Sequence, residues 1–251
     1  MAAYDDYDYP RYWNGRDYEH ESEAIALGAF FTKIGKDKKI IDIGGGYGRL
    51  AKVYGQNAKE ITLAEPSAGL LKKAEDFLEG SSADIKFVQS TIEALPKKIK
   101  GKKYDVAVLV RVMHHIKDPE KAIKIVSRHI PKGGYFILEF ANKLHGKAIV
   151  RNFLSGNFTF PLDIFPIDKR SRKNIKKHSI LFMNHHPDVL ADVLKNNNFR
   201  VIEKRSVSNI RSRKVKKLLS LPILVKIEGI VQKPLARFNF GPSIFILAKK
   251  K

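Results

Sequence analysis

The sequence contains no cysteine in its 251 residues. That absence excludes disulfide bridges, zinc–thiolate sites, iron–sulfur clusters and thiol nucleophiles. A reducing compartment fits this composition, and we expect a cytoplasmic protein. Hydrophobic residues nevertheless make up 43% of the chain, which is enough for a sizeable core.

Long apolar runs are also lacking. No segment reaches the roughly 18 apolar residues that a membrane-spanning helix needs. The longest candidate, residues 218–231, is interrupted by a proline, a glycine and charged side chains. The first 16 residues are acidic and aromatic, without a basic stretch leading into an apolar one, so we expect no secretory signal. We predict no transmembrane segment.

Acidic residues are few. Against 47 Lys and Arg there are 26 Asp and Glu, which gives a net charge of +21. A chain this basic can bind nucleic acid, anionic lipid or acidic substrates. Lysine occurs in nearly every segment, however, so charges that are simply solvated explain the same total. Both explanations stay open at this stage.

The pattern of apolar residues predicts alternating strands and helices. Strands are expected at 40–43, 60–64, 85–88, 104–110 and 134–140, and helices at 19–34, 49–55, 68–78 and 119–129. The run Val106–Val110 is apolar throughout, which is typical of a parallel strand covered on both faces. The predicted fold class is therefore α/β, with a doubly wound, mostly parallel sheet.

Two segments interrupt this alternation. Residues 142–185 and 209–240 are basic, and between them a helix at 186–197 and a strand at 200–207 are expected, with a last strand at 243–248. We interpret both as insertions into one domain that spans residues 1–251. Within it we expect an N-terminal lid and helix at 1–35, a cofactor-binding core at 39–141, and insertions that form a substrate lid, because long loops in compact folds are usually functional.

A glycine-rich turn carries the strongest functional signal. Ile40–Ile43 runs into Gly44, Gly46 and Gly48, and then into a predicted helix. Glycine is required where φ is positive and where backbone must approach a ligand closely. Ligands of open α/β sheets bind at the carboxyl ends of the strands. Arg49 stands where a dinucleotide fingerprint has Gly or Ala, and no P-loop Lys-Ser/Thr follows. The turn thus indicates a nucleotide-like cofactor that is bound without either of these phosphate-binding motifs.

The turn D-x-G-x-G-x-G resembles the class I S-adenosylmethionine-dependent methyltransferase family, in its small-molecule, type-11-like branch. The resemblance covers residues 39–140, with weaker echoes near the carboxyl end. It implies a seven-stranded sheet with an antiparallel last strand, S-adenosyl-L-methionine as cofactor, and methyl transfer as the activity.

The resemblance also implies which residues contact the cofactor. Glu65 ends the second strand, where the family's acidic residue accepts hydrogen bonds from the ribose hydroxyls. The segment at 89–96 resembles the adenine side of the site, although Ser90 stands where the family more often has Asp. The segment at 111–116 resembles the part that faces the methionine moiety. The cofactor-binding residues predicted in this way are Asp42, Gly44, Gly45, Gly46, Gly48, Glu65, Pro66, Ser67, Ser90, Thr91, Ile92 and Arg111.

Each of these residues also has a structural interpretation. Asp42 can satisfy buried backbone amides, and a tight turn needs glycine even without a ligand. Glu65 can be a surface acid. Arg111 can point toward the cofactor carboxylate or an acidic substrate, or it can be solvated at a strand end. The aromatic segment 9–16 can close over the cofactor as a lid or cover the first helix.

Two adjacent histidines, His114 and His115, follow the fourth strand. Adjacent ligands without a nearby carboxylate or Cys form a poor metal site, and we predict none. Helix capping or core packing is one explanation of the pair. The other is that one of them acts as a general base, because the pKa of histidine lies near working pH. For His185 and His186 we expect a helix cap.

The methyl acceptor is not specified by any motif. We expect a small-molecule or lipid-like acceptor, methylated by in-line displacement. Basic residues at 211–217 lead into the apolar stretch 218–231, which can dock on anionic membrane or close the pocket as a lid helix. A nucleic-acid substrate bound by the insertions is the alternative, although no base-methylase or RNA-binding motif is present. A third reading is a non-catalytic binding protein with this fold.

Overall fold

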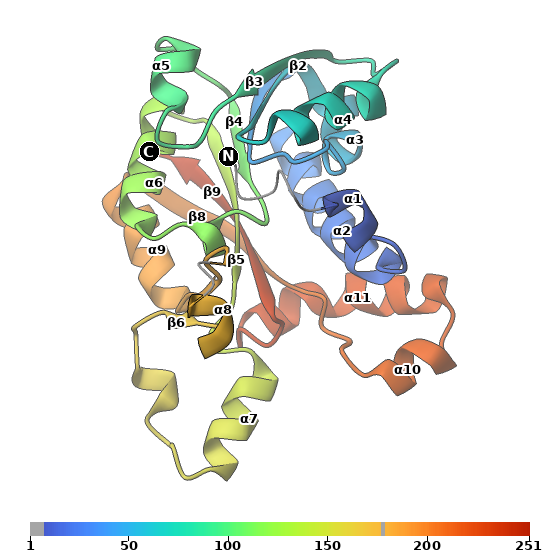
Figure 1. Ribbon diagram of the computed structural model, residues 1–251, viewed down its shortest axis with the longest axis vertical. Coiled ribbons are helices and arrows are strands. Elements are labelled where there is room, and N and C mark those ends of the chain that lie inside the picture. The colour runs from blue at the N-terminus through green and yellow to red at the C-terminus, as the bar shows by residue number, and fades with distance from the viewer. Residues whose placement is uncertain (1–7, 177–178) are drawn as a thin grey trace.

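The computed structural model describes residues 8–176 and 179–251. The first seven residues of the predicted N-terminal lid lie outside the described part of the chain. A central twisted sheet with helices on both faces forms the body of the molecule, and one segment projects away from it (Figure 1).

The main sheet has seven strands in the order β3-β2-β1-β4-β5-β9-β8. Every neighbouring pair from β3 to β5 is parallel, whereas β9 lies antiparallel between β5 and β8. This arrangement confirms the predicted doubly wound sheet with an antiparallel last strand. The strand bounds are Lys38–Ile43 (β1), Ala58–Glu65 (β2), Asp84–Gln89 (β3), Val106–Leu109 (β4), Tyr135–Ala141 (β5), Phe199–Val207 (β8) and Ser243–Lys250 (β9).

Alternation along the central strands divides the core into two layers. Val106 and Val108 of β4 pack into one buried cluster, whereas Ala107 and Leu109 pack into the other. Successive side chains of a strand point to opposite faces, so an entirely apolar strand must be covered twice. The predicted burial of β4 on both faces is therefore confirmed.

Helices cover each face of the sheet (Figure 1). On one face lie α5 (Leu95–Ile99), α6 (Pro119–His129) and α9 (Pro187–Asn196), and their apolar side chains belong to the cluster that contains Ala107 and Leu109. On the other face lie α2 (Asp17–Ile34), α3 (Ala51–Tyr54) and α4 (Ala68–Leu78). A four-residue helix, α1 (Tyr9–Tyr12), precedes them.

Two helices begin and end at the predicted residues, and side-chain caps explain where they begin. The hydroxyl of Ser67 accepts a hydrogen bond from the amide of Leu70 at the start of α4. The carboxylate of Asp118 does the same for Lys121 at the start of α6, where Pro119 occupies the first helical position. Such caps satisfy amides that have no partner inside the helix.

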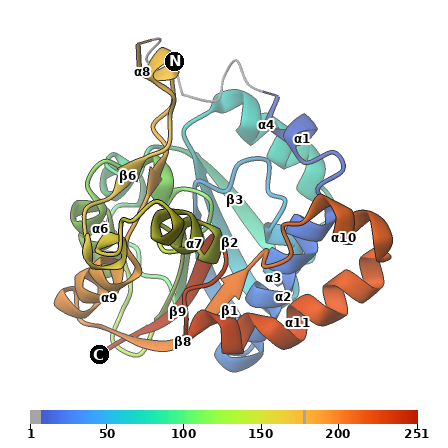
Figure 2. The ribbon, with the colours of Figure 1, turned by 90° about the horizontal axis from the view of Figure 1, so that it is seen from below.

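The two insertions lie in different places. The first contains α7 (Gly146–Leu154), β6 (Ile167–Asp168), α8 (Arg172–Lys176) and β7 (Met183–Asn184), and α7 projects from the lower end of the sheet. The second contains α10 (Arg213–Leu218) and α11 (Leu221–Ala236). Figure 2 shows α11 lying along α2. Within residues 8–176 and 179–251, no helix is both long and apolar enough to cross a bilayer.

Candidate functional site

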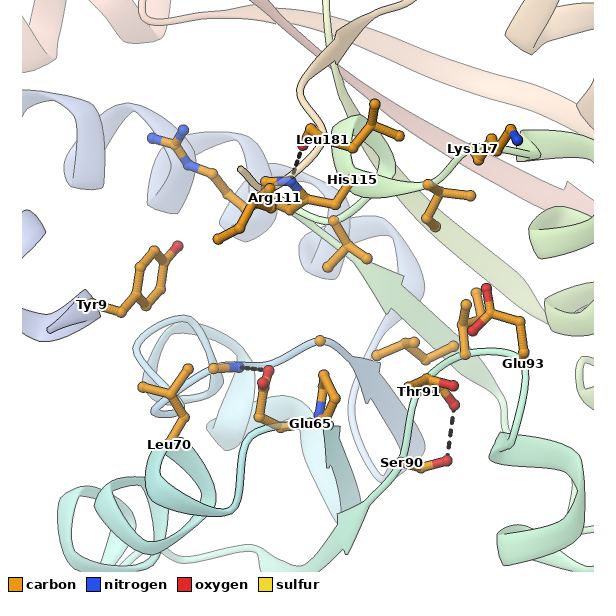
Figure 3. A pocket seen from close by; sticks show the side chains of 18 residues that line it. Tyr9, Glu65, Leu70, Ser90, Thr91, Glu93, Arg111, His115, Lys117 and Leu181 are labelled. Atoms are coloured by element: carbon orange, nitrogen blue, oxygen red, sulfur yellow. Dashed lines mark hydrogen bonds between the residues drawn. The ribbon is translucent and has the colours of Figure 1, made fainter. Parts of the chain in front are cut away.

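A cavity of about 440 Å³ opens at the carboxyl ends of the parallel strands. Its wall combines the turn after β1, the end of β2, and the segments that follow β3 and β4. In Figure 3, Glu65 and Ser90 line one side of the cavity, and Arg111 and His115 line the opposite side. Because β1 lies between β2 and β4, the cavity sits where the direction of strand order reverses, the usual ligand site of this architecture.

The glycines of the turn are required for different reasons. A Cβ on Gly44 would lie 2.3 Å from a methyl carbon of Val112, and one on Gly48 would lie 2.5 Å from Leu78. These two glycines therefore serve close packing inside the protein. A Cβ on Gly46 would instead face Tyr9, whose ring atom would lie 3.3 Å away, and both residues line the cavity. Gly46 has a φ of 59°, which disfavours any side chain.

Glu65 is held in place by the backbone around it. One carboxylate oxygen accepts a hydrogen bond from the amide of Gly46 at 3.1 Å, and the other accepts one from Ser67 at 3.0 Å. Glu65 is only 4% exposed, and it forms part of the cavity wall. The interpretation of Glu65 as a surface acid is therefore wrong, because the carboxylate is buried and aligned by two amides.

Ser90 lies at the position where the related family more often has Asp. Its hydroxyl donates a hydrogen bond to the carbonyl of Thr91 at 2.8 Å. The hydroxyl proton is thereby engaged, and the lone pairs of its oxygen are the groups that remain for a ligand. In this geometry Ser90 acts as an acceptor, which is the property that an Asp carboxylate would also provide.

Asp42 lies beneath the glycine turn. The hydroxyl of Tyr54 donates a hydrogen bond to its carboxylate at 2.5 Å. Burial raises the pKa of Asp42 to about 6. Asp42 and Gly45 do not reach the large cavity, but they line a smaller one of about 20 Å³ that shares Gly44 and Arg111 with it.

Arg111 links the end of β4 to the N-terminal helices. Its backbone is left-handed, with a φ of 65°, and its amide donates a hydrogen bond to Glu139 at 2.7 Å. Its Nε donates to the carboxylate of Glu23 on α2 at 2.9 Å. Burial lowers the pKa of Arg111, but Glu23 together with Glu139 and the nearby tyrosines outweighs this effect and raises the pKa overall. The interpretation of Arg111 as a solvated residue is thus wrong.

Glu23 also pairs with Arg49, which follows the glycine turn. The guanidinium carbon of Arg49 lies 3.4 Å from the ring centroid of Trp13, and that of Arg111 lies 4.8 Å from the same centroid. Trp13 is buried and in contact with both cations, an arrangement that favours cation–π attraction. The N-terminal aromatic segment therefore packs on the cations beside the turn, and only Tyr9 of that segment lines the cavity.

The two histidines after β4 have different surroundings. His115 lines the cavity, and its Nδ1 lies 2.6 Å from the carbonyl oxygen of Leu181. A carbonyl only accepts, so Nδ1 carries the proton and neutral His115 has its lone pair on Nε2. Burial lowers the pKa of His115, which keeps the ring neutral at neutral pH. His114 does not line the cavity; it is buried against the rings of His115 and Phe182.

The remaining predicted residues take the following places. The predicted cofactor residues that line the large cavity are Gly44, Gly46, Glu65, Pro66, Ser90, Thr91, Ile92 and Arg111. Gly48 and Ser67 line neither cavity. Gly48 packs against Leu78, and Ser67 caps α4. His186 caps α9, as expected, by accepting a hydrogen bond from the amide of Asp188, whereas the His185 ring lies 3.2 Å from the Met113 carbonyl.

The insertions contribute unequally to the cavity. Ile180 and Leu181 of the first insertion form part of the wall, and Leu181 also orients His115. Among the described residues, none from the second insertion lines either cavity. Within the same residues, no group of three or more His, Cys, Asp or Glu side chains is placed to hold a metal ion.

Sequence reasoning missed Glu23, although a signal was present. Glu23 lies four residues before Leu27 and eight before Phe31, so it continues the apolar face of α2. A carboxylate at a core position of an amphipathic helix indicates a buried partner. Leu181 and Lys117 also line the cavity, but no local pattern distinguishes them, because their role depends on how distant segments pack.

Comparisons of the sequence with known proteins match it to methyltransferases. A family profile described as a methyltransferase domain matches residues 16–204. A ubiquinone biosynthesis O-methyltransferase from Coxiella burnetii is 24% identical over 127 residues, which are 51% of this chain and 53% of that protein. The chain therefore spans about half the length of the curated relatives it matches.

Solved structures show the same fold. A protein of Listeria monocytogenes, assigned as an S-adenosylmethionine-dependent methyltransferase, superposes with a TM-score of 0.64 at 14% identity, over 94% of this chain and 99% of that one. A methyltransferase structure from Thermotoga maritima superposes with a TM-score of 0.60 at 19% identity, over 99% and 98% of the two chains. At these identities the likeness concerns the fold alone.

Proposed function

The chain belongs to the methyltransferase-domain family, among the class I S-adenosylmethionine-dependent methyltransferases, and on that premise we propose that it methylates a small-molecule or lipid-like acceptor with His115 as general base. The observation that carries the proposal is one cavity lined both by Gly46 and Glu65 and by a neutral histidine of fixed tautomer. The first two suit the cofactor, and the third suits an acceptor that must lose a proton.

The residues present fit S-adenosylmethionine. The bare backbone at Gly46 leaves room that a Cβ would fill, beside the ring of Tyr9. The carboxylate of Glu65 is aimed by two amides, and a carboxylate offers about four lone-pair sites, so ribose hydroxyls can also donate to it. Ser90, as an acceptor, suits an adenine amino group. Arg111 supplies a positive charge for a carboxylate at the other end of the wall.

When bound, S-adenosylmethionine supplies an electrophilic methyl group for in-line displacement. The chain contributes orientation and exclusion of water, and positioning of this kind accounts for roughly 7–11 kcal/mol in well-aligned reactions. Ile43, Val112 and Ile116 give the wall an apolar surface around the polar groups. Such a surface removes water from the reacting atoms.

His115 provides the proton acceptor. The Leu181 carbonyl holds the proton on Nδ1, so Nε2 takes the proton that the acceptor's hydroxyl or amine loses. The lowered pKa of His115 keeps this nitrogen unprotonated at neutral pH. His114 plays no direct part in this proposal, because it lies behind His115 in the core.

Three observations support a small acceptor. The cavity of about 440 Å³, which also has to hold the cofactor, lies in the range of small-molecule sites, roughly 300–1,000 Å³. The curated relative named above acts, by its name, in ubiquinone biosynthesis. Ile180 and Leu181 cover the cavity from the first insertion, which we assign as the substrate lid together with Tyr9.

Calorimetric titration with S-adenosylmethionine tests the cofactor assignment. Gly46→Val is expected to abolish binding, because its side chain enters the cavity beside Tyr9. Gly101→Val is the matched control: Gly101 also has a positive φ, of 75°, but nothing lies within 4 Å of its Cβ position. Unchanged binding by Gly46→Val would refute the assignment.

Transfer from labelled S-adenosylmethionine to pools of quinone precursors, lipids and RNA tests the acceptor. The proposal expects label in a phenolic or lipid-like product. Label in RNA contradicts the acceptor class, and tight cofactor binding without transfer to any pool favours a non-catalytic protein.

A further inference from the structure

The outer part of the first insertion exposes large apolar side chains. We call residues 146–166 the insertion tip; it comprises α7 and the loop after it and projects from the body of the molecule (Figure 1). The side chains concerned are 57–79% exposed: Val150, Phe153, Leu154, Phe158, Leu162 and Phe165. On α7 they follow helical spacing, with Val150, Phe153 and Leu154 on one side, so the outward side of this helix is apolar.

The exposure of these side chains does not come from a loose loop. Leu144, Ala148 and Phe160 form a small core of their own beneath the tip. The buried ammonium of Lys143 donates hydrogen bonds to the carbonyls of Asp163 and Phe165. The loop is thus tied down at its base while its apolar side chains face outward.

Positive charge gathers beside this apolar surface. Lys147 and Arg151 are exposed on α7 itself. Burial, together with Arg211 of the second insertion and Lys169 and Arg151 of the first, lowers the pKa of His145 to about 4. Basic residues of both insertions therefore converge at the base of α7. The acidic residues of the first insertion are already paired, Asp163 with Lys143 and Asp168 with Arg170.

We propose that the insertion tip docks on an anionic lipid bilayer, with Phe153, Leu154 and Phe158 entering the interface and Lys147 and Arg151 contacting the lipid headgroups. A helix with an apolar side and flanking cations binds an interface through buried apolar area and attraction to anionic lipid. The inference is independent of which acceptor the enzyme methylates.

Charge favours a bilayer over the other occupants. A second copy of the chain would bring the same cations of Lys147, Arg151 and Arg211 together, and like charges at an interface are unfavourable. Nucleic acid would match the cations, but it would leave exposed aliphatic side chains such as Leu154 and Leu162 without an apolar partner. An anionic bilayer complements both features.

Vesicle cosedimentation of the full chain, without cofactor, tests the proposal. The wild type is expected to bind phosphatidylcholine vesicles that contain phosphatidylglycerol and to bind pure phosphatidylcholine vesicles much less. The double variant Phe153→Ser/Phe158→Ser should weaken binding to the anionic vesicles about tenfold or more, because it removes two inserted rings. The charge-reversal variant Lys147→Glu/Arg151→Glu should weaken binding by roughly tenfold or more and reduce its dependence on salt.

The matched control is Phe77→Ser, which changes the same residue type on α4, at the opposite end of the molecule from α7 (Figure 1). It should bind anionic vesicles as the wild type does. Thermal unfolding of each variant shows that the fold is kept. Since vesicle binding is measured without methyl transfer, failure of the proposed chemistry leaves this test intact.

Two outcomes would overturn the proposal. One is vesicle binding that neither double variant reduces. The other is a wild-type dimer in sedimentation velocity that Phe153→Ser/Phe158→Ser converts to monomer, since the tip would then bind a second copy of the chain.

Discussion

In the second insertion, α11 buries Glu228 and Gln232 against α2, whereas α7 of the first insertion buries only Ala148. Both insertions are basic and rich in apolar residues, and each contains one buried charged side chain, Lys143 in the first and Glu228 in the second. The Glu228 carboxylate accepts hydrogen bonds from Tyr18 at 2.5 Å and from the amide of Ser208 at 2.8 Å.

The buried charge of the first insertion has different partners. Lys143 binds carbonyls of its own loop and pairs with Asp163 at 2.9 Å. Glu228 thus attaches the second insertion to the body of the fold, whereas Lys143 ties the outer part of the first insertion to its own base. Two insertions of similar composition can therefore have different structural roles. Which role each takes depends on whether the hydrogen-bond partners of its buried charge lie in the body of the fold or within the insertion itself.

The largest effect is expected where the first insertion meets the cavity. His115→Ala should lower kcat roughly 10²–10⁴-fold, because the proton acceptor aligned by Leu181 is lost. Calorimetry should show an unchanged Kd for S-adenosylmethionine. His129→Gln, on α6 and outside the cavity wall, is the control and should keep kcat. A normal kcat in His115→Ala would show that catalysis does not depend on the contact between His115 and the first insertion.

The second insertion should affect stability and leave the cavity unchanged. Glu228→Leu leaves the hydroxyl of Tyr18 and the amide of Ser208 without their buried acceptor. We expect the free energy of unfolding in urea to fall by about 2–5 kcal/mol. Lys226→Leu, at an exposed position of the same helix, should change it by less than about 0.5 kcal/mol. If Glu228→Leu folds but binds S-adenosylmethionine more weakly, the second insertion affects the cavity as well as stability, contrary to this prediction.

A smaller, local effect is expected from Lys143→Met. The carbonyls of Asp163 and Phe165 lose their donor, so the insertion tip should open more easily, by about 1–3 kcal/mol. Hydrogen exchange of amides at 157–166 should speed up, while exchange in β1 and β4 stays as in the wild type. Lys147→Met, at an exposed position, serves as the control. Equal acceleration in the central strands would show that the tip is part of the main cooperative unit.

The pH dependence of kcat gives the finest test of the site. Burial lowers the pKa of His115 from its ordinary value of 6.5. Since the base must be neutral, kcat should be constant at neutral pH and fall as the pH drops through a value below 6.5. His115→Ala should lack this acid limb. A midpoint above 6.5 in the wild type would contradict a buried, neutral histidine at this place.

Much of the fold could be predicted from local patterns. The apolar run of β4, the caps of α4 and α6, and the glycine turn each depend on neighbours within a few residues. Glu65 could be found because it ends a strand beside that turn. In contrast, the sequence could not separate His114 from His115, because the difference between them is the carbonyl of Leu181, 66 residues away from His115.

The sequence by itself determined the sheet and the glycine turn, since strand periodicity, positive φ and helix capping are set by short stretches of chain. The class of cofactor followed from the resemblance of that turn to the methyltransferase family. Only the tertiary structure decided that Gly44 and Gly48 are needed for close packing against Val112 and Leu78, whereas a side chain at Gly46 would enter the cavity. It also decided which insertion supports the fold and which lines the site. Those outcomes depend on pairs such as Tyr18 and Glu228, 210 residues apart, whose energy arises only when burial removes water from both.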